Sequence, residues 1–330
     1  MTHPKVSRRA ALMAGLGAGA ALPGIARGQP SAFPNQPVRL LLPQGPGSGG
    51  DTVARIIADT VSRELGQPLV LESRPGANGL IAINALKQAR ADGHTLLLSG
   101  VSQLSFNPHL YPNLPYDPAQ DFTYVAPVTD TPFVLIASRR SGVATVQDFV
   151  SQARARPGEV TYASAGIGNS THLAAEMIAD RAGLRLSHVP YSGSGQALTS
   201  VVAGQTDAMV SVLGIALPHI ATGAVAPLAV VAERRVPQLP GVPTQREAGL
   251  DAPVMPGWFA VLGPAGMSGA AVEVLNAAFR RALEDASVRR RLEENTLEPL
   301  PGTAADIRGR MEADSAVWGE FIRRRGLRVE

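Results

Sequence analysis

Three loops rich in glycine and serine are the segments of this 330-residue sequence whose residue types best suit ligand binding. They cover residues 44–50, 164–168 and 191–195, and each lies between a predicted strand and a predicted helix. A loop in this position presents free backbone N–H groups and the positive end of a helix, which together favour an anion. The first loop lies more than a hundred residues before the second, so we expect the loops to face one cleft from different lobes.

The first loop also supports a second interpretation, a dinucleotide-binding site. Gly45, Gly47 and Gly50 fit the pattern G-x-G-x-x-G between a strand and a helix, and Glu72 ends the next predicted strand. The alternative function is therefore an exported NAD(P)-dependent oxidoreductase that uses the Gly45–Gly50 loop. It is disfavoured because Pro46 removes one N–H from the loop, and because no acid–base pair follows downstream.

Other catalytic or metal-binding chemistry has less support in the sequence. The loop at 191–195 lacks the first glycine of the G-x-S-x-G pattern of serine hydrolases. His172 and His188 are accompanied by neither an H-x-x-x-H pair nor a carboxylate cluster, so we expect structural roles for both and no metal site. The absence of cysteine excludes disulfides and a cysteine nucleophile. We therefore expect a binding protein without a cofactor.

Residues 1–28 have the features of a secretory signal peptide. A basic segment with Arg8 and Arg9 precedes an apolar run rich in alanine and glycine, and residues 26–28 suit a cleavage site. The basic segment is similar to a twin-arginine motif, with Ala11 in place of the usual phenylalanine, so both export routes stay open. A membrane anchor is disfavoured because the run is short and glycine-rich for a span of about 20 residues.

Removal of this segment changes the charge of the protein. The whole chain has 30 Lys and Arg against 27 Asp and Glu, whereas residues 29–330 have 26 against 27, a net charge of −1. No basic stripe with interleaved aromatic residues follows, so we expect no nucleic-acid partner. No later run reaches the ~18 apolar residues of a membrane span, so we expect the exported protein to be soluble.

Predicted strands and helices alternate at short spacing, which is typical of an α/β protein with mostly parallel sheets. The predicted strands cover residues 38–42, 69–72, 95–99, 123–129, 133–137, 160–163, 186–189, 208–212, 227–231 and 258–262. The predicted helices cover residues 51–65, 145–156, 170–182, 270–285, 287–295 and 304–325, and a further helix starts at Gln196. We expect Asp51 to cap the first helix and residues 145–148 to form a capping box.

Many short motifs resemble one family, the Bug-type or TctC-like solute-binding proteins of tripartite tricarboxylate transporters. They include RPGANG at 74–79 and DGHTLL at 92–97, and further matches lie at 37–40, 43–55, 66–68, 107–108, 116–122, 162–168, 172–174, 188–198, 240–250 and 264–266. Each motif is weak alone, but so many in this order are specific. The resemblance runs over almost the whole chain after residue 28.

The resemblance implies a type II-like periplasmic binding protein with two α/β lobes, each a mostly parallel sheet flanked by helices, and a cleft between them. Lobe 1 would comprise residues 29–130 and 253–330, lobe 2 would comprise 131–252, and the chain would cross near 129–133 and 251–257. The implied function is non-enzymatic capture of a small organic carboxylate by lobe closure. The capture would serve uptake through transporter membrane subunits or sensing, and we expect a monomer.

The resemblance also implies that backbone N–H groups, hydroxyls and water from the three loops hold the ligand carboxylate. The expected binding residues are Gln44, Gly45, Gly47, Ser48, Asp51, Ser102, Ser164, Gly166, Gly168, Asn169, Ser170, Thr171, Tyr191, Gly193, Ser194 and Ser211. The sequence departs from the family pattern at Gln44, usually aromatic, at Ser48, usually glycine, and at Ser211, often aspartate. Because Ser211 removes a carboxylate that would bind an amine, we expect a ligand without a charged amino group.

Overall fold

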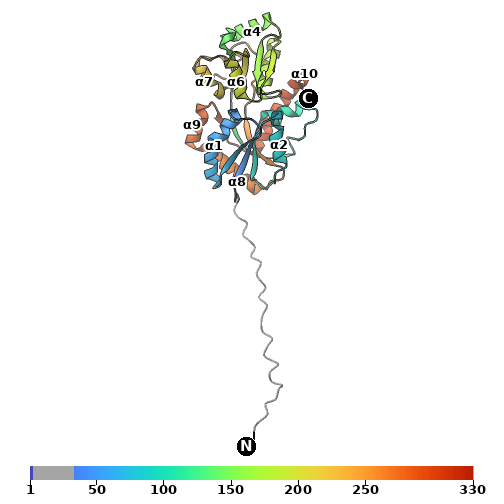
Figure 1. The fold of residues 1–330 in the computed structure, drawn as a ribbon, viewed down its shortest axis with the longest axis vertical. Coiled ribbons are helices and arrows are strands. Elements are labelled where there is room, and N and C mark those ends of the chain that lie inside the picture. The colour runs from blue at the N-terminus through green and yellow to red at the C-terminus, as the bar shows by residue number, and fades with distance from the viewer. Residues whose placement is uncertain (3–32, 330) are drawn as a thin grey trace. The chain divides into compact units, whose positions relative to one another are not determined.

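The computed structural model describes residues 1–2 and 33–329, so the predicted signal peptide lies outside the described residues apart from its first two. In the described part, two sheets flanked by helices form the two lobes (Figure 1). The first sheet has the strand order β11-β4-β10-β3-β1-β2, and the second has the order β7-β6-β8-β5-β9. The first sheet comprises β1 (Val38–Leu42), β2 (Leu69–Ser73), β3 (Thr95–Gly100), β4 (Phe122–Asp130), β10 (Phe259–Pro264) and β11 (Glu298–Pro299). The second comprises β5 (Phe133–Ser138), β6 (Thr161–Ser164), β7 (Ser187–Pro190), β8 (Ala208–Val212) and β9 (Val225–Val231).

The two-lobed α/β fold is confirmed, but both sheets are mixed rather than mostly parallel. β1 runs parallel to β2 and β3, and β6 runs parallel to β7 and β8. In contrast, β10 is antiparallel to β3 and β4, and β5 is antiparallel to β8 and β9. The chain enters β5 and β10 directly from the opposite sheet. Parallel neighbours require a helical crossover within one sheet, and these two strands have none, so they run antiparallel to their neighbours.

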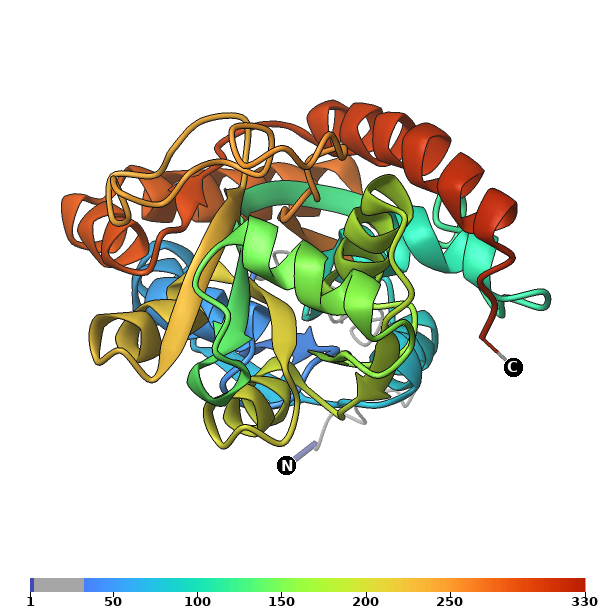
Figure 2. The same cartoon turned by 90° about the horizontal axis from the view of Figure 1, so that it is seen from above.

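The helices divide between the same two lobes, as Figure 1 shows by colour and label. Those beside the first sheet are α1 (Gly49–Leu65), α2 (Leu80–Lys87), α8 (Gly269–Glu284), α9 (Ala286–Glu294) and α10 (Ala304–Arg325). Those beside the second sheet are α4 (Val146–Ala155), α5 (Ser170–Ala182), α6 (Ser194–Val202) and α7 (Leu213–Ala221). The π-helical turn η2 (Ser102–Phe106) continues into α3 (Asn107–Leu110), and Figure 2 shows both in turquoise beside the red α10. The tail beyond α10 returns to α3, where Val329 N donates a hydrogen bond to Leu110 O at 3.0 Å.

The first helix begins earlier than predicted, and this changes the role of Asp51. Ser48 is the N-cap of α1, and its hydroxyl accepts a hydrogen bond from Asp51 N at 3.2 Å. The Asp51 carboxylate accepts in turn from Gly47 N at 3.0 Å. The serine hydroxyl and the carboxylate thus satisfy N–H groups on both sides of the helix start. Asp51 therefore supports the cap and does not provide it.

The chain passes between the two sheets twice, and the two passages touch. Thr131 and Pro132 join β4 directly to β5, and residues 232–258 return from β9 to β10. A Cβ atom added to Gly257 in the second passage would lie 2.0 Å from the carbonyl oxygen of Thr131 in the first. Only glycine permits this approach of one backbone to another.

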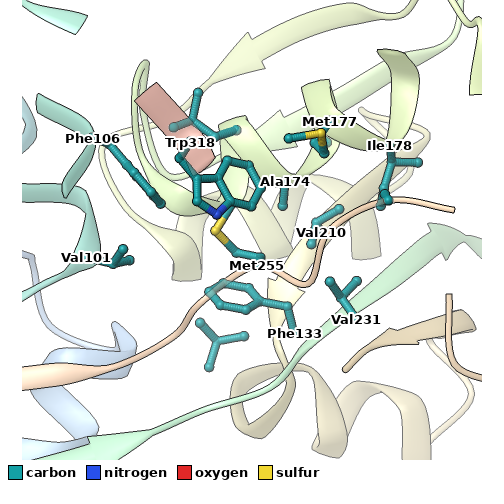
Figure 3. Close-up of a cluster of buried hydrophobic side chains, with 14 of the residues drawn as sticks. Val101, Phe106, Phe133, Ala174, Met177, Ile178, Val210, Val231, Met255 and Trp318 are labelled. Carbon is teal, nitrogen blue, oxygen red and sulfur yellow. The ribbon is translucent and has the colours of Figure 1, made fainter. Parts of the chain in front are cut away.

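Apolar packing is continuous across the region where the passages meet. One cluster of buried side chains contains residues of both lobes, among them Trp318 from α10 and Phe133 from β5. Figure 3 shows Met255, from the second passage, between these two rings. Within the described residues, no helix has the combination of length and apolar character that crossing a membrane requires.

Candidate functional site

Two adjoining cavities lie between the lobes and share four lining residues, Gln44, Gln103, Asn169 and Ser194. The outer cavity has a volume of about 580 Å³, which is in the range of small-molecule sites. The inner cavity has a volume of about 20 Å³, enough for a water molecule and little more. Of the two, only the outer cavity has room for an organic molecule.

The three glycine- and serine-rich loops converge on these cavities. Of the residues expected from the sequence, the outer cavity is lined by Gln44, Gly45, Ser48, Gly166, Asn169, Tyr191, Gly193 and Ser194. The inner cavity is lined by Gln44, Ser102, Asn169, Ser170, Thr171 and Ser194. A contact between the lobes closes the inner end, where Ser170 N donates to Ser102 Oγ at 3.1 Å. The loops come together because each follows the carboxyl end of a strand.

Five expected residues, Gly47, Asp51, Ser164, Gly168 and Ser211, line neither cavity. The N–H of Gly47 is used by Asp51, whose buried carboxylate also accepts from Arg55 Nε at 3.0 Å. Ser211 is fully buried, and its hydroxyl donates to Val212 O at 3.2 Å. The bonding groups of Gly47, Asp51 and Ser211 are thus engaged within the protein.

Ser164 and Gly168 are bonded to a stack of aromatic rings beneath the second loop. Ser164 Oγ lies 2.6 Å from His188 Nε2, and Gly168 N donates to His172 Nδ1 at 3.2 Å. The His188 ring stacks on His172 with 4.1 Å between centroids and on Tyr162 with 4.8 Å. Ser164 is fully buried, and no Asp or Glu among the described residues hydrogen-bonds to His188, so the pair lacks the third group that orients the base of a catalytic triad.

The histidine stack makes stability depend on pH in a definite direction. Burial, and then the neighbouring His172, lowers the pKa of His188 to about 3. Between pH 6.5 and 3 the unfolded chain binds a proton at this histidine that the folded protein does not bind, so stability falls as the pH falls through this window. Above pH 7 the contribution is constant.

We expect His188→Gln to reduce this acid sensitivity, because glutamine can still bond to Ser164 but does not titrate. Melting temperatures measured from pH 8 to pH 3.5 should fall less steeply for the variant than for the wild type below pH 6.5. His219→Gln removes a histidine outside the stack and serves as the control. Equal slopes for the wild type and His188→Gln would show that His188 does not stay neutral in the folded state.

The helices that directly follow the three glycine- and serine-rich loops differ in how their first turns are capped. α1 is capped by the Ser48 side chain and α5 by the Asn169 side chain. The N-cap of α6 is Gly193, and no side chain among the described residues caps this helix. The first turn of α6 therefore keeps N–H groups and a positive dipole end for a bound anion.

Two polar side chains at the junction of the cavities have no hydrogen-bond partner among the described residues. Ser194, the first residue of α6, is only 5% exposed and lines both cavities. Gln44 lines both cavities from the opposite lobe. Because both side chains face the cavities without a protein partner, they are free to bind a ligand or water there.

The walls of both cavities are uncharged. None of the described lining residues is Asp, Glu, Lys, Arg or His. Among the described residues there is also no group of three or more metal-ligating side chains. An anion here would be bound by neutral donors, and an ammonium group would lack a carboxylate. The expected preference against amines thus rests on the whole lining and not on Ser211.

Sequence reasoning did not assign a role to the loop at 75–79, which forms part of the outer wall. Ala77 and Asn78 have positive φ angles of 45° and 48°. Asn78 Nδ2 donates to Asn107 Oδ1 at 2.7 Å, and Gln103 Nε2 donates to Asn78 O at 3.1 Å. The Gly-Ala-Asn-Gly run could have indicated the turn, but its bonding partners lie about 25–30 residues away in the sequence.

The structure disfavours the dinucleotide interpretation of the first loop. Glu72, the residue that would bind a ribose, is paired with Arg39 at 2.6 Å and with Arg74 at 2.6 Å. These two cations lower the pKa of Glu72. Since Gly47 N is also bonded to Asp51, both the acid and one of the loop N–H groups are already engaged.

Comparison with known proteins gives matches along most of the chain. The family model described as "Tripartite tricarboxylate transporter family receptor" matches residues 53–327. Protein BugT of Bordetella pertussis is 32% identical over 299 residues, which cover 90% of this chain and 92% of the relative. A UPF0065 protein of Pseudomonas sp. strain P51 is 34% identical over 292 residues, which cover 88% of this chain and 87% of the relative.

Solved structures similar to this chain include two with bound acids. An R. palustris protein with adipate has a TM-score of 0.85 and 32% identity, with 88% of this chain and 97% of that chain covered. MatC from Rhodopseudomonas palustris with bound malate has a TM-score of 0.83 and 31% identity, with 87% and 99% covered. The periplasmic binding protein BugD has a TM-score of 0.85 and 27% identity, with 90% and 100% covered.

Proposed function

This chain belongs to the tripartite tricarboxylate transporter family of receptors, and from that premise we propose that it captures a small organic carboxylate without catalysing a reaction. Receptors of this family are periplasmic, and the signal-like residues 1–28 would export this one. The relatives solved with adipate and with malate support a carboxylate as the ligand. The uncharged cavity walls, without an acid–base pair, favour binding over chemistry.

One observation carries this proposal: unpartnered donors from opposite lobes meet at the junction of the two cavities. The Ser194 hydroxyl and the uncapped first turn of α6 supply donors from lobe 2, and the Gln44 amide supplies a donor from lobe 1. Hydrogen bonds to a charged acceptor contribute about 1.5–3 kcal/mol each. A carboxylate at the junction would satisfy all three.

Capture would proceed by lobe closure, with lobe 1 formed by residues 29–130 and 253–330 and lobe 2 by residues 131–252. A ligand that touches both lobes binds the closed form more tightly and shifts the population towards it. Ion pairs between the lobes would form in the same step. Arg324 and Arg325 at the end of α10 pair with Asp180 at 2.7 Å and Glu176 at 3.1 Å on α5.

The closed monomer would then present a surface made from both lobes to a partner. In uptake this partner is the membrane part of a transporter, and in sensing it is a receptor that reads the closed form. Both roles need the same property of this chain, which is a difference between the ligand-free and ligand-bound arrangement of the lobes.

A thermal-shift screen followed by isothermal titration tests the proposed function. We expect some carboxylates to raise the melting temperature by several degrees, since a ligand at a hundredfold excess over its Kd contributes about 2.7 kcal/mol. The panel contains mono-, di- and tricarboxylates and aromatic acids, with the matching amides as uncharged controls. A shift with NADH but with no carboxylate would support the oxidoreductase instead.

A further inference from the structure

The walls of the outer cavity indicate which kind of chemical group would extend from the carboxylate of the ligand. Resting on the function proposed above, we propose that the ligand is a monocarboxylate with an apolar chain or ring. The carboxylate binds at Ser194, Gln44 and the start of α6, and the apolar part fills the outer cavity. This distinguishes the ligand from the di- and tricarboxylates that carry charge at both ends.

The sizes of the cavities decide where the apolar part lies. The inner cavity, at about 20 Å³, admits no carbon chain beyond the carboxylate. The outer cavity, at about 580 Å³, is many times larger and lies within the range of small-molecule sites. The outer cavity therefore leaves room for six or more carbon atoms beyond the junction.

Apolar side chains from both lobes surround that room. Ile167 of the second loop lines the cavity and is 47% exposed, so its side chain is available for contact with a ligand. Tyr191 lies in the same lobe, and lobe 1 contributes Tyr111 and Val329. Prolines 43, 46 and 75 complete the apolar walls. A chain or ring in the cavity would cover these surfaces and displace the water on them.

Several polar side chains of the outer wall, other than Gln44 and Ser194 at the junction, are already bonded to protein partners. Ser48 Oγ accepts from the first turn of α1, and Asn78 Nδ2 donates to Asn107 Oδ1. At the exposed rim, Ser192 Oγ donates to Gln196 Oε1 at 2.6 Å. No described residue of the lining is cationic. The carboxylate at the junction would bind the unpartnered donors of Ser194, Gln44 and the start of α6. A second carboxylate further out would lose hydration with neither these donors nor a described cation beside it, which is unfavourable.

Hexanoate and adipate test the inference directly, because both have six carbons and they differ only in the second carboxylate. Titration calorimetry of the wild-type protein should give a Kd for hexanoate or 3-phenylpropionate at least tenfold below those for adipate, malate and citrate. If adipate, malate or citrate binds as tightly as the two apolar acids, the inference is overturned and the proposed function stands. If no acid of the panel binds, the proposed function itself is rejected, and the inference with it.

A pair of variants at Ile167 locates the apolar part of the ligand. Ile167→Ser should raise the Kd for hexanoate about tenfold, whereas Ile167→Leu should keep it within about threefold of the wild type. Val317→Ser removes a side chain that is 50% exposed on α10 and lines neither cavity, so it should leave the Kd unchanged. An equal Kd in Ile167→Ser and the wild type would overturn the placement of the apolar part in the outer cavity.

Discussion

Replacing Ser194 with aspartate is expected to abolish carboxylate binding in a protein that still folds. The new carboxylate would sit at the first residue of α6, beside N–H groups that no side chain caps. A negative charge at this end of a helix stabilises the helix by about 0.3–1 kcal/mol. The same carboxylate would occupy the proposed ligand position, where it would repel a second negative charge because no described lining residue is a cation. We expect at least a hundredfold increase in Kd, or ~2.7 kcal/mol, in isothermal titration.

Two control variants separate three effects, which are the negative charge placed at residue 194, the loss of the Ser194 hydroxyl and the change in the net charge of the protein. Ser151→Asp changes the net charge equally, but Ser151 is exposed on α4 and lines neither cavity, so its Kd should stay within a few-fold of the wild type. Ser194→Ala removes one hydrogen bond and should raise the Kd about tenfold. Melting temperatures would show that all three variants are folded. Wild-type affinity in Ser194→Asp would mean that the anion does not bind at the start of α6.

The order of the elements could be predicted from the sequence because it depends on local patterns. The spacing of Val53, Ile57 and Val61 predicts the buried face of α1, and the capping box of Thr145 with Asp148 is present in the structure. α7 was missed because it is apolar on most sides and contains Pro218, so no amphipathic period is visible. The antiparallel direction of β5 and β10 was missed because it depends on the path between the lobes.

The sequence predicts the three loops that form the candidate site, but it does not predict the role of each residue within them. A glycine-rich loop between a strand and a helix indicates where an anion could approach, and the outer and inner cavities lie at these loops. Whether a particular N–H or hydroxyl is free depends on the side chain that turns towards it. Gly47 is bonded to Asp51, and Ser164 is bonded to His188, whereas Ser194 has no partner among the described residues. Only the folded arrangement distinguishes these cases.

Gly257→Ala is expected to destabilise the protein at the point where its two passages between the lobes meet. The added Cβ would lie 2.0 Å from the backbone oxygen of Thr131, which cannot move aside as a flexible side chain could. Overpacking of this kind costs about 1–3 kcal/mol and sometimes more. We expect a loss at the upper end, about 3 kcal/mol in urea-induced unfolding. The next residue, Trp258, is buried and donates from Nε1 to Asp314 Oδ2 at 2.6 Å, so the second passage cannot shift freely.

Gly241→Ala is the matched control, because no atom lies within 4 Å of the Cβ it would add. It should leave stability unchanged or raise it by about 0.4–1 kcal/mol through the entropy of the unfolded chain. Gly214→Ala tests a second close approach between the lobes, since its Cβ would lie 2.1 Å from the backbone oxygen of Asn295. If Gly257→Ala were as stable as Gly241→Ala, the passages would have to separate easily.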